Sequence, residues 1–139
     1  MARYLVVGNQ TITSAELLDV LTTRAAAEPS TFHIVVPMRH GEGAWSEGAA
    51  HVAAEARLHQ ALDHFRAARL DVTGTVGDLD PVAAVADVVA ADRGFDEIIV
   101  STLPPGISFW LGRGVPQRIA REHPHVPVTH VVAEPVPAG

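Results

Sequence analysis

The sequence contains no cysteine and no lysine, and each absence excludes a type of chemistry. Without cysteine there is no disulfide, no thiolate nucleophile and no thiolate metal site, and this composition is typical of a reducing compartment, so we expect a cytoplasmic protein. All 10 basic residues are arginine, which excludes a Walker lysine and a Schiff-base lysine.

Long hydrophobic runs and a basic surplus are missing as well. No apolar run approaches the ~20 residues of a membrane span, and the first residues lack the layout of a signal peptide. The formal net charge is −6, so we expect neither nucleic acid nor a membrane as a partner. The G-x-S-x-G motif is absent, so serine-histidine-acid catalysis has no support.

Apolar runs alternate with helical patterns along the 139 residues, a length that suits one domain. This alternation predicts an α/β fold: a five-stranded parallel sheet with helices on both faces. The expected strands are 4–7, 32–36, 72–76, 98–100 and 128–132. Four helices are expected. The first begins after an N-cap at Thr13, and the second runs from near position 45 or 47 to near position 70. The third begins after an N-cap at Asp80, and the fourth runs from position 115 to position 122.

In order and spacing, these pieces resemble the universal stress protein family over nearly the whole chain. The resemblance rests on the strands at 4–7 and 33–36, the long alanine-rich helix, Gly77-Asp78 ahead of a helix, the segment 95–100 and Val126-Pro127-Val128. It implies a single universal-stress-protein-like domain over residues 1–139, a Rossmann-like three-layer sandwich with strand order 3-2-1-4-5. It also implies a dimer and, in many members, ATP bound above the first and fourth strands.

The candidate ligand site lies where the first and fourth strands end. Glycines there let backbone N–H groups reach phosphates, and Asn9, where the resemblance implies an aspartate, can hydrogen-bond a base or ribose. We expect ATP, or another nucleotide, phosphate or small anionic ligand, to contact Gly8, Asn9, Thr11, Val36, Ser101, Thr102, Gly106, Gly112 and Arg113.

The loop after the fourth strand departs from the family pattern, which is G-x-x-G, nine residues, then Gly with Ser or Thr. Pro104 and Pro105 each remove an N–H donor, and Arg113 replaces the final hydroxyl. We therefore expect weak ATP binding, or none. Three interpretations stay open: a smaller or altered phosphate ligand, ordinary ATP binding, or a rigid connection that packs Phe109 and Trp110 over the sheet edge.

Two further ligand classes have weaker support. The hydroxyl-rich segment 9–14 resembles a flavin-phosphate loop, but a helix cap alone explains Thr13. His51, Glu55 and His59 would span ~12 Å along a helix, too far for one metal shell, so we expect a solvated polar face. His33 and His130 lie in strands and are expected to be hydrogen-bonded structural side chains.

The sequence therefore predicts a non-enzymatic module of the stress-response type that senses a nucleotide or other small ligand. We expect it to act as a homodimer, paired through its last strand at 128–132, because an apolar edge strand needs a cover. The alternatives are a ligand-free structural or adaptor dimer, and a slow ATPase or phosphate-ester hydrolase that uses Ser101, Thr102 and Arg113.

Overall fold

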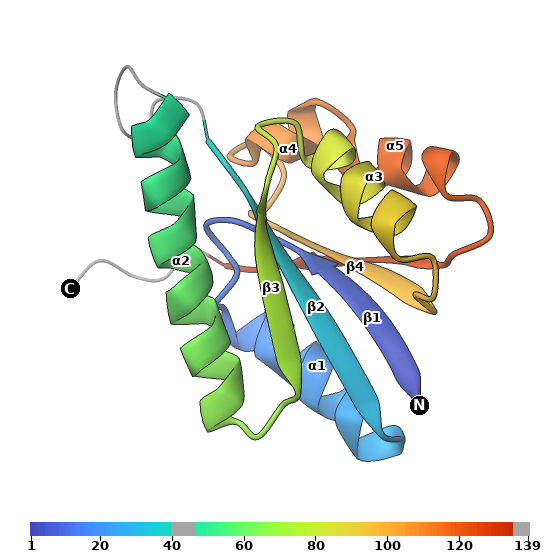
Figure 1. Cartoon of the computed structure of the whole chain (residues 1–139). Coiled ribbons are helices and arrows are strands. Elements are labelled where there is room, and N and C mark those ends of the chain that lie inside the picture. The colour runs from blue at the N-terminus through green and yellow to red at the C-terminus, as the bar shows by residue number, and fades with distance from the viewer. Residues whose placement is uncertain (40–46, 135–139) are drawn as a thin grey trace.

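A five-stranded sheet forms the middle layer of the protein (Figure 1). The computed structural model describes residues 1–39 and 47–134. Within them the strand order is β3-β2-β1-β4-β5 and every neighbouring pair is parallel, as the sequence predicted. The strands are β1 (Ala2–Val7), β2 (Ser30–Pro37), β3 (Val72–Gly77), β4 (Glu97–Thr102) and β5 (Val128–Val132).

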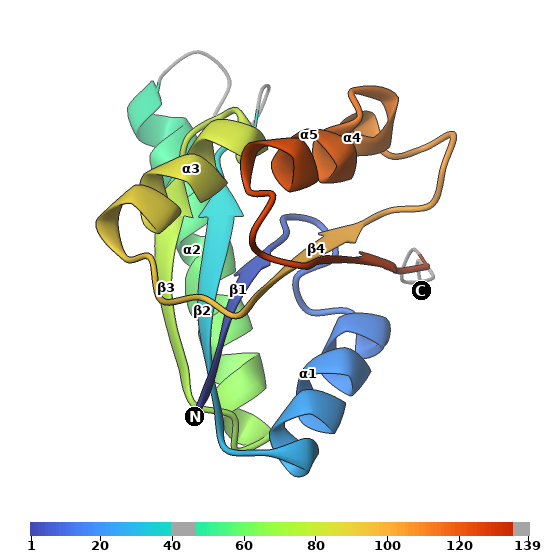
Figure 2. The same ribbon diagram turned by 90° about the vertical axis from the view of Figure 1, so that its right-hand side faces the viewer.

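Helices cover both faces of this sheet, so the expected three-layer arrangement is confirmed (Figure 2). Two of them, α1 and α2, lie on one face, whereas α3 and α5 lie on the other, with α4 next to α5. The helices are α1 (Ala15–Ala27), α2 (Glu47–Ala67), α3 (Pro81–Ala91), α4 (Phe109–Gly112) and α5 (Val115–Glu122).

Alternate residues of the central strands feed two separate cores. On β1, Tyr4 and Val6 join the core beneath α1 and α2, whereas Leu5 and Val7 join the core beneath α3 and α5. Strands buried on both faces need nearly continuous apolar runs, which explains the composition of β1, β2 and β4. The first core also contains Leu58, Leu62 and Phe65 of α2, the stripe that their spacing indicates.

The expected N-cap of the first helix was wrong by one residue. Ser14, not Thr13, caps α1: its hydroxyl accepts a hydrogen bond from the N–H of Leu17 at 3.1 Å. Both hydroxyls suit the role, and the turn that precedes the helix selects between them, because the Ser14 N–H donates to the carbonyl of Thr11. Glu16, in the first turn of α1, accepts a hydrogen bond from the backbone N–H of Glu134, which follows β5.

Other elements differ from expectation as well, and most strands are one or two residues longer at an end than expected. The second helix ends at Ala67 rather than near position 70, because Arg69 adopts a left-handed conformation with φ 65°. The possible start at Trp45 lies outside the described residues. The fourth strand continues through Thr102 because Ser101 and Thr102 pair with Val131 and Val132. A fifth helix, α4, was not expected, and Ser108 caps it by accepting from the N–H of Leu111.

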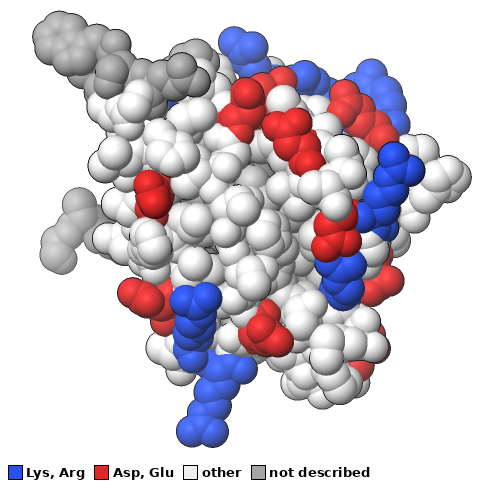
Figure 3. Space-filling model, viewed as in Figure 1, with Lys and Arg blue, Asp and Glu red and all other residues white. Residues whose placement is uncertain are grey.

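The surface carries charges of both signs. On the face shown in Figure 3, basic and acidic side chains are interspersed and do not gather in one patch of either sign. None of the described helices is both long enough and apolar enough to cross a membrane.

Candidate functional site

A cavity of about 320 Å³ opens at the carboxyl ends of the strands. In a doubly wound sheet a ligand crevice is expected there, beside the strands where the order reverses, which are β1 and β4 in this protein. The segments after β1, β2, β3 and β4 line it together with α4. The lining residues are Asn9, Gln10, Thr11, Met38, Arg39, Leu79, Pro81, Ser101, Thr102, Leu103, Ser108, Phe109 and Trp110.

The hydroxyls of Thr11, Ser101 and Thr102 belong to the polar part of the wall, and each is hydrogen-bonded within the protein. The hydroxyls of Thr11 and Ser101 are buried and lie 2.6 Å apart in one hydrogen bond. The hydroxyl of Thr102 donates to the carbonyl of Leu103 at 2.8 Å and so accepts from Nε2 of His130, 2.7 Å away. This wall holds the ends of β1, β4 and β5 together and leaves few hydroxyl donors for a ligand.

Asn9 is the buried side chain of this wall with an unmet hydrogen-bonding need. Its Nδ2 donates to the carbonyl of Pro37, whereas its Oδ1 has no partner among the described residues. A buried acceptor without a partner costs about 1–3 kcal/mol of stability, so the Oδ1 of Asn9 is an unfavourable feature of the cavity wall. The bond to Pro37 also ties the loop after β1 to the end of β2.

The starts of three helices lie at or near the cavity, and their own side chains already cap them. Ser14 caps α1 and Ser108 caps α4. The carboxylate of Asp80 accepts from the N–H of Val82 at the start of α3 and pairs with Arg118 of α5, 3.7 Å away. Capped in this way, these helix starts offer an anion fewer free N–H donors than open ones would.

The structure brings four of the nine predicted ligand residues together in the cavity wall: Asn9, Thr11, Ser101 and Thr102. The other five are not among the described lining residues. A side chain at Gly8 would meet Ile12 and Ser101, and the side chain of Val36 belongs to the core beneath α1 and α2. Gly106, at φ 91°, and Gly112 have open space around them, and Arg113 follows α4.

Arg113 has a contact that sequence reasoning did not anticipate. Its guanidinium stacks over the ring of Phe109, 4.8 Å from the centroid. Phe109 is 65% exposed and lines the cavity, so it does not pack over the sheet edge as one of the three open interpretations held. Trp110 does pack against the core beneath α3 and α5.

The segments that follow β2 and β3 also line the cavity, and none of their lining residues was expected from the sequence. Met38 and Arg39 follow β2, Leu79 lies between β3 and α3, and Pro81 is the first residue of α3. A usable signal existed, since the carboxyl ends of parallel strands meet at the same edge of a sheet. The resemblance pointed to the ends of β1 and β4, and Val36 was the one ligand residue expected from β2.

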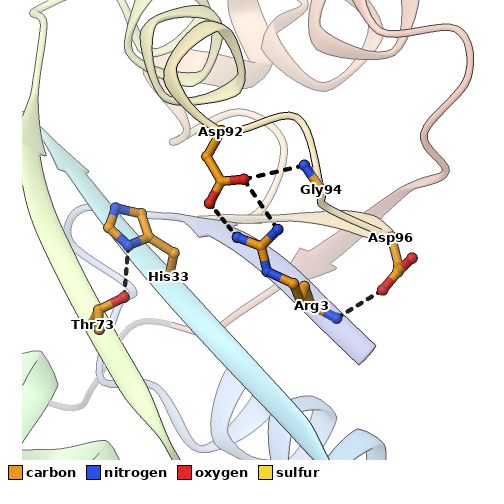
Figure 4. Close-up of polar contacts among 6 residues, drawn as sticks. All are labelled: Arg3, His33, Thr73, Asp92, Gly94 and Asp96. Atoms are coloured by element: carbon orange, nitrogen blue, oxygen red, sulfur yellow. Dashed lines mark hydrogen bonds and ion pairs between the residues drawn. The ribbon is translucent and has the colours of Figure 1, made fainter. Parts of the chain in front are cut away.

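A second cavity, of about 550 Å³, lies beside β3 and α3, and its lining residues include His33 and Asp92, whose polar contacts Figure 4 shows. The guanidinium of Arg3 pairs with the carboxylate of Asp92, and the Arg3 N–H donates to Asp96 at 2.8 Å. The ring nitrogens of His33 lie 2.7 Å from the hydroxyl of Thr73 and 3.2 Å from that of Thr75. These contacts join the start of β1 and the middle of β2 to their neighbours, which is a structural role.

The histidines behave largely as expected. His33 and His130 are hydrogen-bonded within the sheet, and His51 and His59 are exposed on α2. His51 lies 3.6 Å from Glu55, one turn along the helix. Within residues 1–39 and 47–134, no group of three or more His, Cys, Asp or Glu side chains is placed to hold a metal ion.

No protein-family model matches the chain, and a search of curated proteins found no match. Solved structures do match it. A universal stress protein in complex with cAMP shares 18% identity at a TM-score of 0.57, over 97% of this chain and 98% of that one. A universal stress protein from Archaeoglobus fulgidus shares 14% identity at a TM-score of 0.64, over 94% of this chain and 93% of that one. These likenesses confirm the fold that the sequence resemblance implied.

Proposed function

We propose that this protein, which has the fold of universal stress proteins, is a nucleotide-sensing module that binds a small ligand at the carboxyl ends of β1 and β4. The observation that carries the proposal is the cavity of about 320 Å³ at the point where the strand order reverses. Its volume falls within the range of about 300–1,000 Å³ that is typical of small-molecule sites. One similar structure is a complex with cAMP, which supports a nucleotide-like ligand.

The proposal assigns no catalysis to the chain and treats residues 1–139 as one domain. Among the described residues that line the cavity there is no Asp, Glu or His to act as a general base or to hold Mg²⁺. Ser101 and Thr102, the hydroxyls that a phosphate-ester hydrolase would use, are hydrogen-bonded within the wall. These features favour binding over hydrolysis. We place the protein in the cytoplasm on its cysteine-free composition alone.

Dimerisation through β5 is the second part of the proposal. The carbonyl of Pro127 accepts from Ile98, and the N–H of Ala133 donates to Thr102, so the odd-numbered residues of β5 bond to β4. The backbone groups of positions 128, 130 and 132 therefore point to the outer edge of the sheet. With Val132 40% exposed on that strand, the edge is suited to pairing with a second copy.

The test of ligand binding uses the purified protein and two variants. Leu79→Trp places a large ring at the mouth of the cavity, whereas Val52→Trp makes the same change on an exposed position of α2. We expect mass spectrometry after mild denaturation to find a co-purified small molecule, or nucleotides to raise the melting temperature, in wild type and Val52→Trp but not in Leu79→Trp. Equal melting temperatures without ligand would show that both variants fold.

A negative result in two assays would contradict the proposal. If wild type releases no small molecule and no nucleotide raises its melting temperature, the cavity is not a ligand site. Equal binding by wild type and Leu79→Trp would place the ligand elsewhere on the protein.

A further inference from the structure

Part of the cavity wall is apolar. Leu103, Phe109 and Trp110 come from the segment after β4, and Met38, Leu79 and Pro81 come from the segments after β2 and β3. Trp110 packs against the core beneath α3 and α5, which holds one side of this wall in place. Apolar and aromatic walls with a few polar groups are suited to a flat ring.

The polar part of the cavity is poor in the groups that bind a chain of phosphates. A triphosphate requires several converging N–H donors, cations or a divalent metal. Arg39 is the one charged residue among the described lining residues, and the hydroxyls of Thr11, Ser101 and Thr102 already bond within the wall. Pro81 has no N–H, and the N–H of Val82 beside it is bonded to Asp80.

Arg113, the cation that was expected from the sequence to hold phosphate, is not among the described residues that line the cavity. It covers one face of the Phe109 ring, so its position supports the rim of the apolar wall. The cavity therefore combines a substantial surface for a ring with a small capacity for anionic charge.

We infer that the ring of the ligand supplies most of the binding free energy, so that the cavity binds a nucleoside about as tightly as the corresponding monophosphate or triphosphate. This inference rests on the proposed function. It predicts that affinity stays nearly constant as phosphates are added, and that Mg²⁺ has no effect, because the described wall contains no carboxylate to hold it.

Titration calorimetry with adenosine, AMP and ATP, each with and without millimolar Mg²⁺, tests the inference. We expect the three dissociation constants to agree within about threefold. A matched pair of variants tests the ring wall. Phe109→Ala removes a side chain that is 65% exposed and lines the cavity, whereas Ile107→Ala removes one that is 58% exposed and does not line it.

We expect Phe109→Ala to weaken all three ligands by about three- to tenfold, in line with the worth of one aromatic contact, and Ile107→Ala to leave them unchanged. ATP binding that is at least tenfold tighter than adenosine binding would overturn the inference and leave the proposed function intact. Equal affinities in Phe109→Ala and Ile107→Ala would also overturn it. If none of the three ligands binds, the inference fails, and the search for a co-purified molecule then decides the proposed function separately.

Discussion

At the residue scale, His33 of β2 contacts the neighbouring strand β3 through its ring (Figure 4). Burial lowers the pKa of His33 below its ordinary value; the charge of Asp92 opposes this shift and the charge of Arg3 adds to it. The two ring nitrogens bond to hydroxyls of β3, so the side chain links β2 to the edge strand. His33 also lines the second cavity, the one of about 550 Å³, together with His51 and Asp87.

We predict that the free energy of unfolding falls as the pH drops below the unfolded-state pKa of His, about 6.5. In the window between that value and the lower native pKa, the unfolded chain binds a proton that the native protein does not, so protonation favours unfolding. The contribution of His33 is therefore complete above this window and is lost on acidification. Urea unfolding at about pH 7.5 and about pH 5.5 measures the slope.

The matched variants are His33→Gln and His59→Gln, the latter on an exposed position of α2. We expect His33→Gln to flatten the dependence on pH and His59→Gln to leave it unchanged. An identical slope in wild type and His33→Gln would show that other groups carry the whole effect.

At the scale of single elements, the start of α1 distinguishes two neighbouring hydroxyls. Thr13 and Ser14 both suit an N-cap by residue type, but only Ser14 places its hydroxyl at the N–H of Leu17. Thr13 is exposed. The difference arises from the turn after β1, in which Ser14 donates its own N–H to Thr11.

We predict that Ser14→Ala lowers the free energy of unfolding by about 0.5–2 kcal/mol, the usual cost of a lost N-cap. Thr13→Ala serves as the control and should change it by no more than about 0.5 kcal/mol, as is usual for an exposed position. Chemical denaturation followed by circular dichroism measures both. Equal losses in the two variants would mean that the cap is shared or frayed.

At the scale of the whole molecule, the outer edge of β5 is the surface that we propose to pair with a second copy of the chain. Val131 and Val132 are adjacent, yet their roles differ. Val131 is buried and its backbone bonds to β4, whereas Val132 is 40% exposed and its backbone faces outward. Substitution of Val131 therefore disturbs the fold itself, and Val132 is the position that tests the dimer.

We predict that the wild-type chain elutes as a dimer at micromolar concentration and that Val132→Pro converts it to a monomer. Proline removes a donor from the outer edge, where the monomer makes no use of it. Val131→Pro should instead lower the free energy of unfolding, because it removes a bond between β4 and β5. Light scattering gives the mass and urea unfolding gives the stability. A monomeric wild type would refute the proposed assembly.

The local sequence pattern alone was sufficient to predict most of the helices and strands. Apolar runs, separated by helical patterns, predicted the positions of β1 to β5. Asp80 and Pro81 predicted the start of α3, where the carboxylate of Asp80 accepts a hydrogen bond from the N–H of Val82. The short helix α4 was not foreseen, because its four residues are too few to show a period.

The sequence by itself determined the α/β class, the two buried faces of β1 and the absence of thiol and lysine chemistry, since these depend on residue type and on spacing within one element. Tertiary structure decided which side chains meet at the cavity beside the ends of β1 and β4. The hydroxyls of Thr11 and Ser101 are 90 positions apart in the chain and 2.6 Å apart in the fold. Such contacts arise from the order of the strands, which brings the carboxyl ends of β1 and β4 together, and no spacing along the chain encodes that distance.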